Sequence, residues 1–250
     1  MNAEFILKYV LVAIIYLHVS LSKDLPPYFP ICHQNDLKLG ECLLNATNTL
    51  KPHLEKGFPE FGIPEIDPLV IPMAKLEQDT KSVNYKAMFI NMTVKGLSDY
   101  KFTEINTNIS RLTIDGNVKF NQLTMESDYF ITGRVFKTAV NGMGVFSVTF
   151  NHTSCSFSLR GHLVERKGHK YYENKNTLIK IHIEKAELDF DNLLNDDEEL
   201  NKKTNEFISE NTKQILEEVK PAIESMIEIF LNDVIHNVAN STSFDVLFPK

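Results

Sequence analysis

The segment from Lys56 to Pro72 most constrains how this chain can fold. It contains four prolines within fourteen residues: Pro59, Pro64, Pro68 and Pro72. Proline lacks a backbone N–H and pushes the preceding residue into extended geometry, so a helix is excluded here. Yet the other residues are too apolar for a solvated linker: Phe58, Phe61, Ile63, Ile66, Leu69, Val70 and Ile71. We therefore expect a rigid, extended segment that crosses the surface of the fold and lies against apolar side chains.

Residues 1–22 have the pattern of a secretory signal peptide. Lys8 supplies a weak positive charge, residues 9–17 are uninterruptedly apolar, and Ser20 and Ser22 are small residues before a cleavage point at Lys23. A membrane span needs about 20 apolar residues, and no later stretch is long and apolar enough. We therefore expect a secreted mature chain, residues 23–250, without a transmembrane segment. Its length suits one large or two small domains.

Charge and aromatic content narrow the class of partner. The formal net charge is −7, and acidic and basic residues are mixed along the chain without a basic stripe. Nucleic acid is therefore not expected as a partner. The chain has 17 Phe and 8 Tyr but no Trp. In an acidic, secreted protein, this composition favours a dry, Phe-lined interior.

An extracellular location has consequences for the cysteines and for the glycosylation sequons. Cys32 and Cys42 lie ten positions apart and should form a disulfide in an oxidising compartment. Cys155 is left over, either as a buried apolar residue or as a reactive or intermolecularly bonded thiol. Asn-x-Ser/Thr sequons make five asparagines candidates for glycosylation: Asn45, Asn91, Asn108, Asn151 and Asn240.

Periodicity predicts a helix, then a sheet, then a second helix. Apolar spacing predicts a first helix from a cap at Asn35 or Asp36 to about Leu50, ended by Pro52. Residues 83–190 change to the two-residue alternation of strands. Three turns are expected in this region, at Asp115-Gly116, residues 141–144 and Lys167-Gly168. The pattern is typical of a meandering antiparallel sheet.

The last part of the chain predicts one very long helix. Apolar residues recur at spacings of three and four from Leu200 to Val238, and Pro221 should kink the helix. Beyond Pro221 the apolar stripe widens to half the circumference, so another element must cover the helix. The long sheet has an apolar face that must itself be covered, so the sheet and the helix could cover each other. The fold class is therefore α+β, and a sheet curled around one helix could leave a cavity.

Several segments together resemble the takeout / juvenile hormone-binding protein family of insects. The resemblance covers nearly the whole mature chain, and it rests on the order and spacing of its motifs. These motifs are the Cys32–Cys42 pair, residues 57–69 (GFPEFGIPEIDPL), Tyr129 with Gly133 and Gly142-Met143-Gly144, residues 190–195 (FDNLLN), Leu200 with Asn205-Glu206-Phe207, Lys220-Pro221, and Phe244 with Leu247-Phe248-Pro249.

The resemblance implies a fold and a function. The fold is a long C-terminal helix wrapped by a highly curved antiparallel sheet, which encloses an apolar tunnel. Residues 23–250 would then be a single ligand-binding domain of a secreted, non-catalytic carrier. Its ligand would be a long-chain lipid, a terpenoid or a juvenile-hormone-like molecule. Hormone-binding members have a second disulfide, for which Cys155 has no partner here, so the resemblance favours the takeout-like branch.

Candidate tunnel residues come from the strands and the long helix. They are Tyr129, Ile131, Val135, Phe146, Val148, Ile181, Ile223, Met226 and Phe230. Tyr129 shares a strand face with Ile131 and Val135, so its hydroxyl could orient the oxygen end of a ligand. Alternatively, its hydroxyl lies at the rim. Met226 and Phe230 are expected nearest the ligand, and ordinary core packing is the alternative.

Motifs of catalysis and of metal binding are missing from the sequence. The histidines have no ligand spacing, and no Gly-x-Ser-x-Gly or Gly-x-Gly-x-x-Gly motif occurs. We expect no catalytic residue, no metal and no cofactor. Two other functions remain open: a secreted signalling or interaction protein whose bound lipid is structural, and a lipid-ester hydrolase. The oligomeric state is also open, with a monomer as one possibility.

Overall fold

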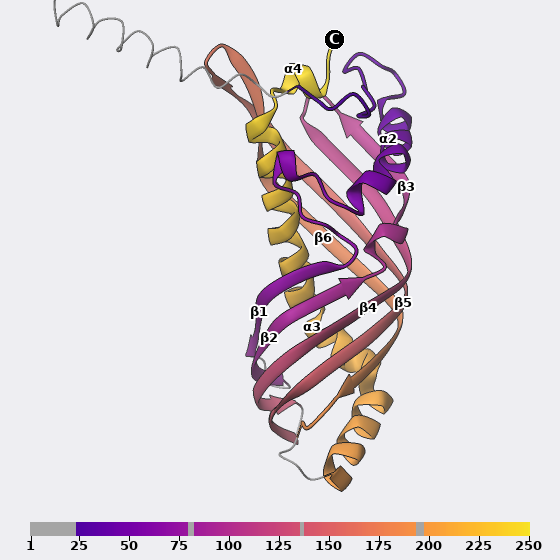
Figure 1. Cartoon of the computed structure of the whole chain (residues 1–250), viewed down its shortest axis with the longest axis vertical. Coiled ribbons are helices and arrows are strands. Elements are labelled where there is room, and N and C mark those ends of the chain that lie inside the picture. The colour runs from indigo at the N-terminus through magenta and orange to yellow at the C-terminus, as the bar shows by residue number, and fades with distance from the viewer. Residues whose placement is uncertain (1–23, 80–82, 136–137, 194–197) are drawn as a thin grey trace, which may run out of the picture.

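A computed structural model of the chain describes residues 24–79, 83–135, 138–193 and 198–250 (Figure 1). The expected signal peptide, residues 1–22, lies outside these ranges. Within them, five side chains are also outside the description: Gln78, Val83, Val135, Thr138 and Glu198.

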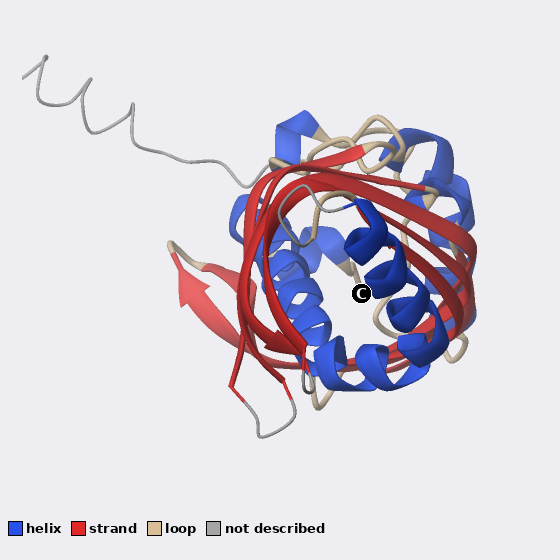
Figure 2. Cartoon of the chain, turned by 90° about the horizontal axis from the view of Figure 1, so that it is seen from below, coloured by secondary structure: helices blue, strands red, loops and turns tan. Residues whose placement is uncertain are grey.

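The centre of the fold is a six-stranded antiparallel sheet. Its strands are β1 (Leu69–Asp79), β2 (Val83–Lys95), β3 (Lys101–Asn108), β4 (Thr113–Val135), β5 (Thr138–Arg166) and β6 (His169–Phe190). The spatial order is β1-β2-β4-β5-β6, and β3 pairs with β4 beside this path. The strands curve around the long C-terminal helix when the molecule is viewed along its long axis (Figure 2). The predicted fold class, a long helix wrapped by a curved antiparallel sheet, is confirmed.

Bulges help to curve the sheet. The register between β2 and β4 shifts between Ile90 and Thr93, and the register between β5 and β6 shifts between Arg160 and Gly161. Asn91 and His152 have positive φ angles of 54° and 53° inside their strands. A bulge bends its strand and increases the local twist, so the long strands can wrap around a helix instead of lying flat.

The predicted long C-terminal helix is confirmed. Helix α3 (Glu198–Ser241) is 44 residues long and continues through Pro221. At about 1.5 Å per residue, its length is about 66 Å, so it runs beside the whole sheet (Figure 1). Polar side chains join it to the edge strand β6 at three levels. The Asn205 amide donates to the Phe190 carbonyl (2.8 Å) and accepts from the Phe190 N–H (3.1 Å).

The other two connections lie higher on the helix. Glu224 is buried and accepts hydrogen bonds from the Lys180 ammonium (2.8 Å) and from the Ile181 N–H (3.1 Å). Asn232 accepts from the Thr177 hydroxyl at 2.6 Å. Helix α3 thus satisfies main-chain groups that an edge strand would otherwise leave without partners.

The proline-rich segment packs on the far end of α3. Phe58, Phe61 and Ile63 are buried together against Val234 and Val238. A short 3₁₀ helix, η1 (Pro59–Phe61), turns the chain, so the expectation of a continuously extended segment is wrong there. From Leu69 onward the segment is strand β1. This edge strand tolerates Pro72, which has no pairing partner in the β1–β2 register.

Two of the three predicted turns are wrong. Asp115-Gly116 lies inside β4, and residues 141–144 lie inside β5. These glycines serve close packing instead: a Cβ on Gly144 would approach the Asp191 carbonyl oxygen to 2.3 Å. The Lys167-Gly168 turn is confirmed, with positive φ at both residues.

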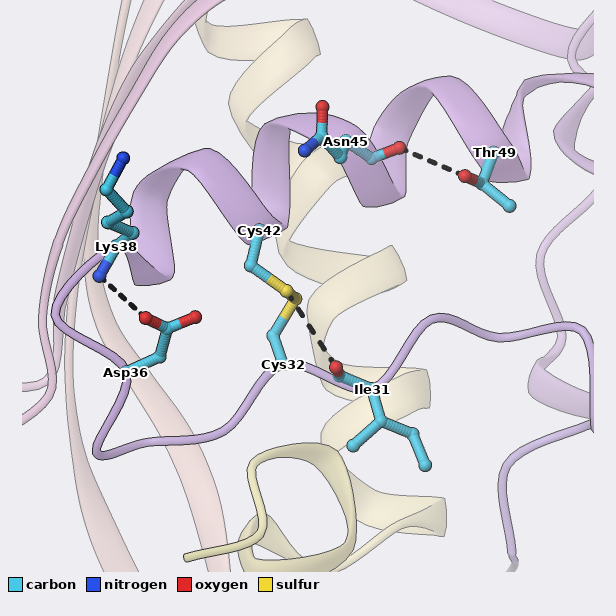
Figure 3. The surroundings of a disulfide bond; sticks show 7 residues. All are labelled: Ile31, Cys32, Asp36, Lys38, Cys42, Asn45 and Thr49. Carbon is cyan, nitrogen blue, oxygen red and sulfur yellow. Dashed lines mark hydrogen bonds between the residues drawn. A yellow bond between two sulfur atoms is a disulfide. The ribbon is translucent and has the colours of Figure 1, made fainter.

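Helix α2 (Leu39–Leu54) covers the outer end of β3. It begins later than predicted, because Asp36 accepts from the Lys38 N–H in the preceding loop and does not cap the helix. It also ends later, because Pro52 is accommodated in its last turn. The predicted Cys32–Cys42 disulfide is confirmed and ties this helix to the arm before it (Figure 3). Two further short helices are η2 (Leu97–Asp99) and α4 (Phe244–Leu247).

The cysteines give a first prediction. Cys155 is free and buried, and burial, with the nearby Glu224 charge, raises the pKa of its thiol to about 11. We expect peptide mapping without reduction to join Cys32 to Cys42, and Cys155 to react with iodoacetamide only after unfolding. Cys32→Ser should cost about 3 kcal/mol of unfolding free energy in the chain-entropy model. A Cys155 disulfide, or rapid alkylation of the folded protein, would contradict this assignment.

Glu224 gives a second prediction. Glu224→Ala leaves the Ile181 N–H without its partner, so it should lower the free energy of unfolding by about 2 kcal/mol in urea denaturation. Glu217→Ala is the matched control on the same helix. Glu217 is exposed and its contact with Lys220 is 3.8 Å long, so its loss should cost about 0–1 kcal/mol. Equal effects of the two variants would disprove the structural role of Glu224.

The contribution of Glu224 should also depend on pH. Burial alone would raise the pKa of its carboxyl group, but hydrogen bonds from Lys180 and Ile181 outweigh burial and lower the pKa. A lowered folded-state pKa means that the stabilisation is complete above the unfolded-state pKa, near 4.5. It is lost as the pH falls through the folded-state value. The stability difference between wild type and Glu224→Ala should therefore shrink below that pH.

Candidate functional site

A cavity of about 210 Å³ lies between the concave face of the sheet and α3. We call it the central cavity. The strands and the following turn supply Leu76, Tyr85, Ala87, Phe89, Met92, Met125, Tyr129, Ile131, Val140, Phe146, Phe150, Leu188, Phe190 and Leu193. Helix α3 supplies Thr204, Phe207, Ile208, Ile215, Leu216, Val219, Ile223 and Met226. Side chains of the sheet thus form one wall and α3 forms the other.

The lining of the central cavity extends along half of α3. Its α3 residues run from Thr204 to Met226. At about 1.5 Å per residue, this stretch of helix is about 33 Å long. A small volume spread over such a length leaves room for one extended chain rather than for a compact ring system. For scale, an apolar cavity of about 150 Å³ holds benzene.

Only three residues of the lining carry a hydroxyl group, and two of the hydroxyls already donate hydrogen bonds. Thr204 donates to the Leu200 carbonyl of its own helix (2.8 Å). Tyr129 is 1% exposed and donates to the Asp191 carbonyl at 2.7 Å. The third is Tyr85, whose hydroxyl is buried and has no hydrogen-bond partner among the side chains and backbone that the structure describes.

Both tyrosines stay neutral under ordinary conditions. Burial raises the pKa of Tyr85 to about 12. Burial, together with the charges of Asp191 and Asp189, raises the pKa of Tyr129 to about 12. The central cavity therefore has an uncharged lining, in which carbon atoms dominate.

The structure brings five of the predicted tunnel residues to the central cavity: Tyr129, Ile131, Phe146, Ile223 and Met226. The others lie elsewhere. Val148 is buried in the adjacent core, and Ile181 belongs to a second core beside Cys155. Phe230 is half-buried further along α3 and is not part of the lining. Val135 ends β4, and its side chain is outside the described residues. That the five lining residues bind a ligand stays a prediction.

The structure corrects the reason for selecting Tyr129. Its ring lies in the lining, as the shared face with Ile131 predicts. Its hydroxyl, however, holds the Asp191 carbonyl in the turn after β6. Because the proton is already donated within the protein, the hydroxyl fastens this turn rather than offering a free donor to a ligand.

Sequence reasoning missed most of the lining on β2. Tyr85, Ala87 and Phe89 alternate with exposed or half-buried residues, so their common face was visible in the pattern. Met92 has the opposite parity yet lies in the same lining. The bulge at Asn91 shifts the register by one residue and turns Met92 inward, which simple alternation cannot show.

The described part of the chain offers neither a metal site nor a membrane-spanning helix. No group of three or more His, Cys, Asp or Glu side chains there could hold a metal ion. Within the same residues, no helix has both the length and the apolar character to cross a bilayer. Four of the predicted glycosylation sites are exposed, namely Asn45, Asn91, Asn108 and Asn240, and Asn151 is half-buried.

A solved structure shares this architecture. Takeout 1 of Epiphyas postvittana superposes with a TM-score of 0.74 at 19% sequence identity, and the match covers 88% of this chain and 100% of that one. A lipopolysaccharide binding protein matches with a TM-score of only 0.34 at 9% identity, over 83% of this chain and 39% of that one. Curated protein sequences contain no match.

A family model provides the broader comparison. It is described as haemolymph juvenile hormone binding protein (JHBP), and it matches residues 10–249, almost the whole chain. The curved sheet around one long helix is also the fold of Takeout 1. The chain therefore belongs to the takeout / juvenile hormone binding protein family.

Proposed function

We propose that this protein is a secreted, non-catalytic carrier of a small hydrophobic ligand, which it holds in the central cavity. The observation that carries the proposal is the elongated, uncharged cavity between the sheet and α3. Transfer of an apolar chain from water into such a cavity is favourable by about 25 cal/mol per Å² of buried surface. This energy suffices for binding without any charged anchor.

The lining supports a flexible, chain-like ligand. Met92, Met125 and Met226 all contribute to the lining. Methionine is unbranched and adapts to irregular shapes, so three methionines let the cavity adjust to a ligand that bends. A long-chain lipid, a terpenoid or a juvenile-hormone-like molecule has this character. The family description, haemolymph juvenile hormone binding protein, agrees with this class of ligand.

Juvenile hormone itself is the less favoured ligand. The only free cysteine of the described chain, Cys155, is buried in a core beside Ile179 and Ile181. A second disulfide, which the resemblance associates with hormone-binding members, has no partner cysteine in this sequence. We therefore place the protein nearer the takeout-like members.

The setting of the carrier is extracellular in this proposal. Residues 1–22 would be removed as a signal peptide, and residues 23–250 would act as a single ligand-binding domain. The disulfide at Cys32–Cys42 supports an oxidising compartment. Asn45 and Asn91 are our preferred glycan sites, because Asn108 caps the Arg111 N–H and Asn240 accepts from Arg166.

Extraction of the purified, secreted protein tests the proposal directly. We expect mass spectrometry of an organic extract to show an apolar molecule released intact, and the delipidated protein to take up a fluorescent fatty acid. If the extract contains no apolar molecule and the delipidated protein takes up no fatty acid, the carrier function is disproved. Steady product formation from a lipid ester would instead favour the hydrolase.

Enlarging Met226 separates a ligand cavity from ordinary core. Met226→Phe should fill the central cavity, so fatty-acid uptake should fall at least ten-fold while the melting temperature stays nearly constant. The control is Ile181→Phe, in a core outside the cavity, where overpacking should cost about 1–3 kcal/mol and leave the intrinsic affinity unchanged. Lost stability with unchanged uptake for Met226→Phe would remove Met226 from the binding site.

A further inference from the structure

The hydroxyl of Tyr85 is a buried hydrogen-bond donor for which the described part of the chain provides no acceptor. Tyr85 is 5% exposed, its ring lines the central cavity, and its hydroxyl has no partner among the residues that the structure describes. A buried hydroxyl without a partner costs about 1–3 kcal/mol. A phenylalanine would fill the same space without this cost, so packing alone does not account for the hydroxyl.

The neighbouring strand β4 offers no side chain to Tyr85 at this level. Tyr85 pairs with Gly133 of β4 and with Gln78 of β1, whose side chain is outside the described residues. Gly133 has a φ of 139°, and a Cβ there would approach the Tyr85 Cα to 2.6 Å and the Asn84 carbonyl oxygen to 2.3 Å. Every side chain is therefore excluded from position 133. On the β4 side, Tyr85 therefore lies beside a position that has no side chain.

Tyr85 also stands at one end of the part of the lining that β2 supplies. It is the first residue of β2 in the lining, and the lining continues along that strand to Met92. The apolar residues beside it are Leu76, Ala87, Ile131 and Val219. Tyr129 and Thr204, the other hydroxyl-bearing residues, donate within the protein. Tyr85 is thus the lining residue with a donor to spare.

We propose that Tyr85 is a specificity-determining residue, which donates a hydrogen bond to a carbonyl, ester or ether oxygen at one end of the ligand. The inference rests on the proposed carrier function and adds a ligand class to it: an apolar chain with an oxygen acceptor near one terminus. Because the hydroxyl is buried among the lining side chains, ligand entry must widen the cavity at this point.

The chemistry of the tyrosine suits a neutral acceptor. Burial raises the pKa of Tyr85 to about 12, so the phenol remains a protonated donor at neutral pH. No cationic side chain belongs to the described lining. A carboxylic acid would therefore bind in its protonated form, without a buried charge, whereas a ketone or ester oxygen needs only the one donor.

Two ligands of equal chain length test the inference. Displacement of N-phenyl-1-naphthylamine would give the dissociation constants of dodecane and 2-dodecanone for wild type, Tyr85→Phe and Tyr129→Phe. For Tyr85→Phe we expect the ketone to bind about five-fold more weakly, the worth of one net hydrogen bond, and the alkane to bind unchanged. Tyr129→Phe is the matched control, because its lost hydroxyl serves Asp191. It should change both ligands by the same factor.

Thermal unfolding of the ligand-free variants gives an independent readout. Tyr85→Phe should leave the melting temperature equal or higher, since it removes an unpartnered hydroxyl. Tyr129→Phe should lower it. A comparable fall for Tyr85→Phe would show that the protein already pairs this hydroxyl, and the proposal would be overturned.

The binding outcomes separate this inference from the carrier function. If dodecane binds all three proteins and Tyr85→Phe leaves the ketone affinity unchanged, the carrier function stands and the role of Tyr85 falls. Loss of both ligands by an equal factor in Tyr85→Phe also rejects that role. If neither ligand binds wild type, the carrier function and the role of Tyr85 fail together.

Discussion

The attachment of α3 to the edge of β6 is the constraint on which the rest of the structure depends. A curved sheet has two edges and one concave apolar face. The backbone groups of the edges need hydrogen-bond partners, and the apolar face must be covered from water. Asn205, Glu224 and Asn232 bind β6 at three levels. The same helix therefore covers one edge of the sheet and packs into its concave face. Because the helix position is set by polar contacts at the edge, apolar packing in the interior need not be complete. The central cavity is the space that remains.

This division of roles explains how an unfilled cavity is tolerated. A cavity in a core costs stability in proportion to its volume, because its lining loses van der Waals partners. Here the compensation lies outside the cavity: in the hydrogen bonds to β6, in the second core around Ile179 and Ile181, and in the aromatic cluster of Phe58 and Phe61 on the end of α3. Part of the folding energy therefore arises outside the walls of the central cavity.

The sequence predicts elements that depend on local periodicity. The α3 helix follows from apolar spacing of three and four, the Lys167-Gly168 turn from its residue types, and the Cys32–Cys42 bridge from cysteine spacing together with the expected signal peptide. Predictions failed where a residue type serves a distant contact. Gly142 and Gly144 resemble a turn, but they are needed because the backbone of Asp191 and Asn192 crosses directly above them. Nothing near these glycines in the sequence indicates that crossing.

The binding site was predictable only in outline for the same reason. Strand parity places Tyr129 and Ile131 on the inner face, but the bulge at Asn91 reverses parity and hides Met92. The state of a hydroxyl is less predictable still. Tyr85 and Tyr129 are both buried tyrosines on neighbouring strands. They differ because the Asp191 carbonyl, sixty-two residues after Tyr129 in the sequence, accepts a hydrogen bond from the Tyr129 hydroxyl, whereas the Tyr85 hydroxyl has no such acceptor among the described residues.

The order of elements along the chain has a consequence for biosynthesis. Every strand precedes α3, so the ribosome completes the concave face of the sheet before the helix that fills it. Translation proceeds at about 5–20 residues per second, which leaves this apolar face uncovered for seconds in each nascent chain. The long, non-local pairing of β4 with β5 adds to the delay. Until α3 has been synthesised, the same apolar face that later lines the central cavity is therefore open to aggregation with other nascent chains.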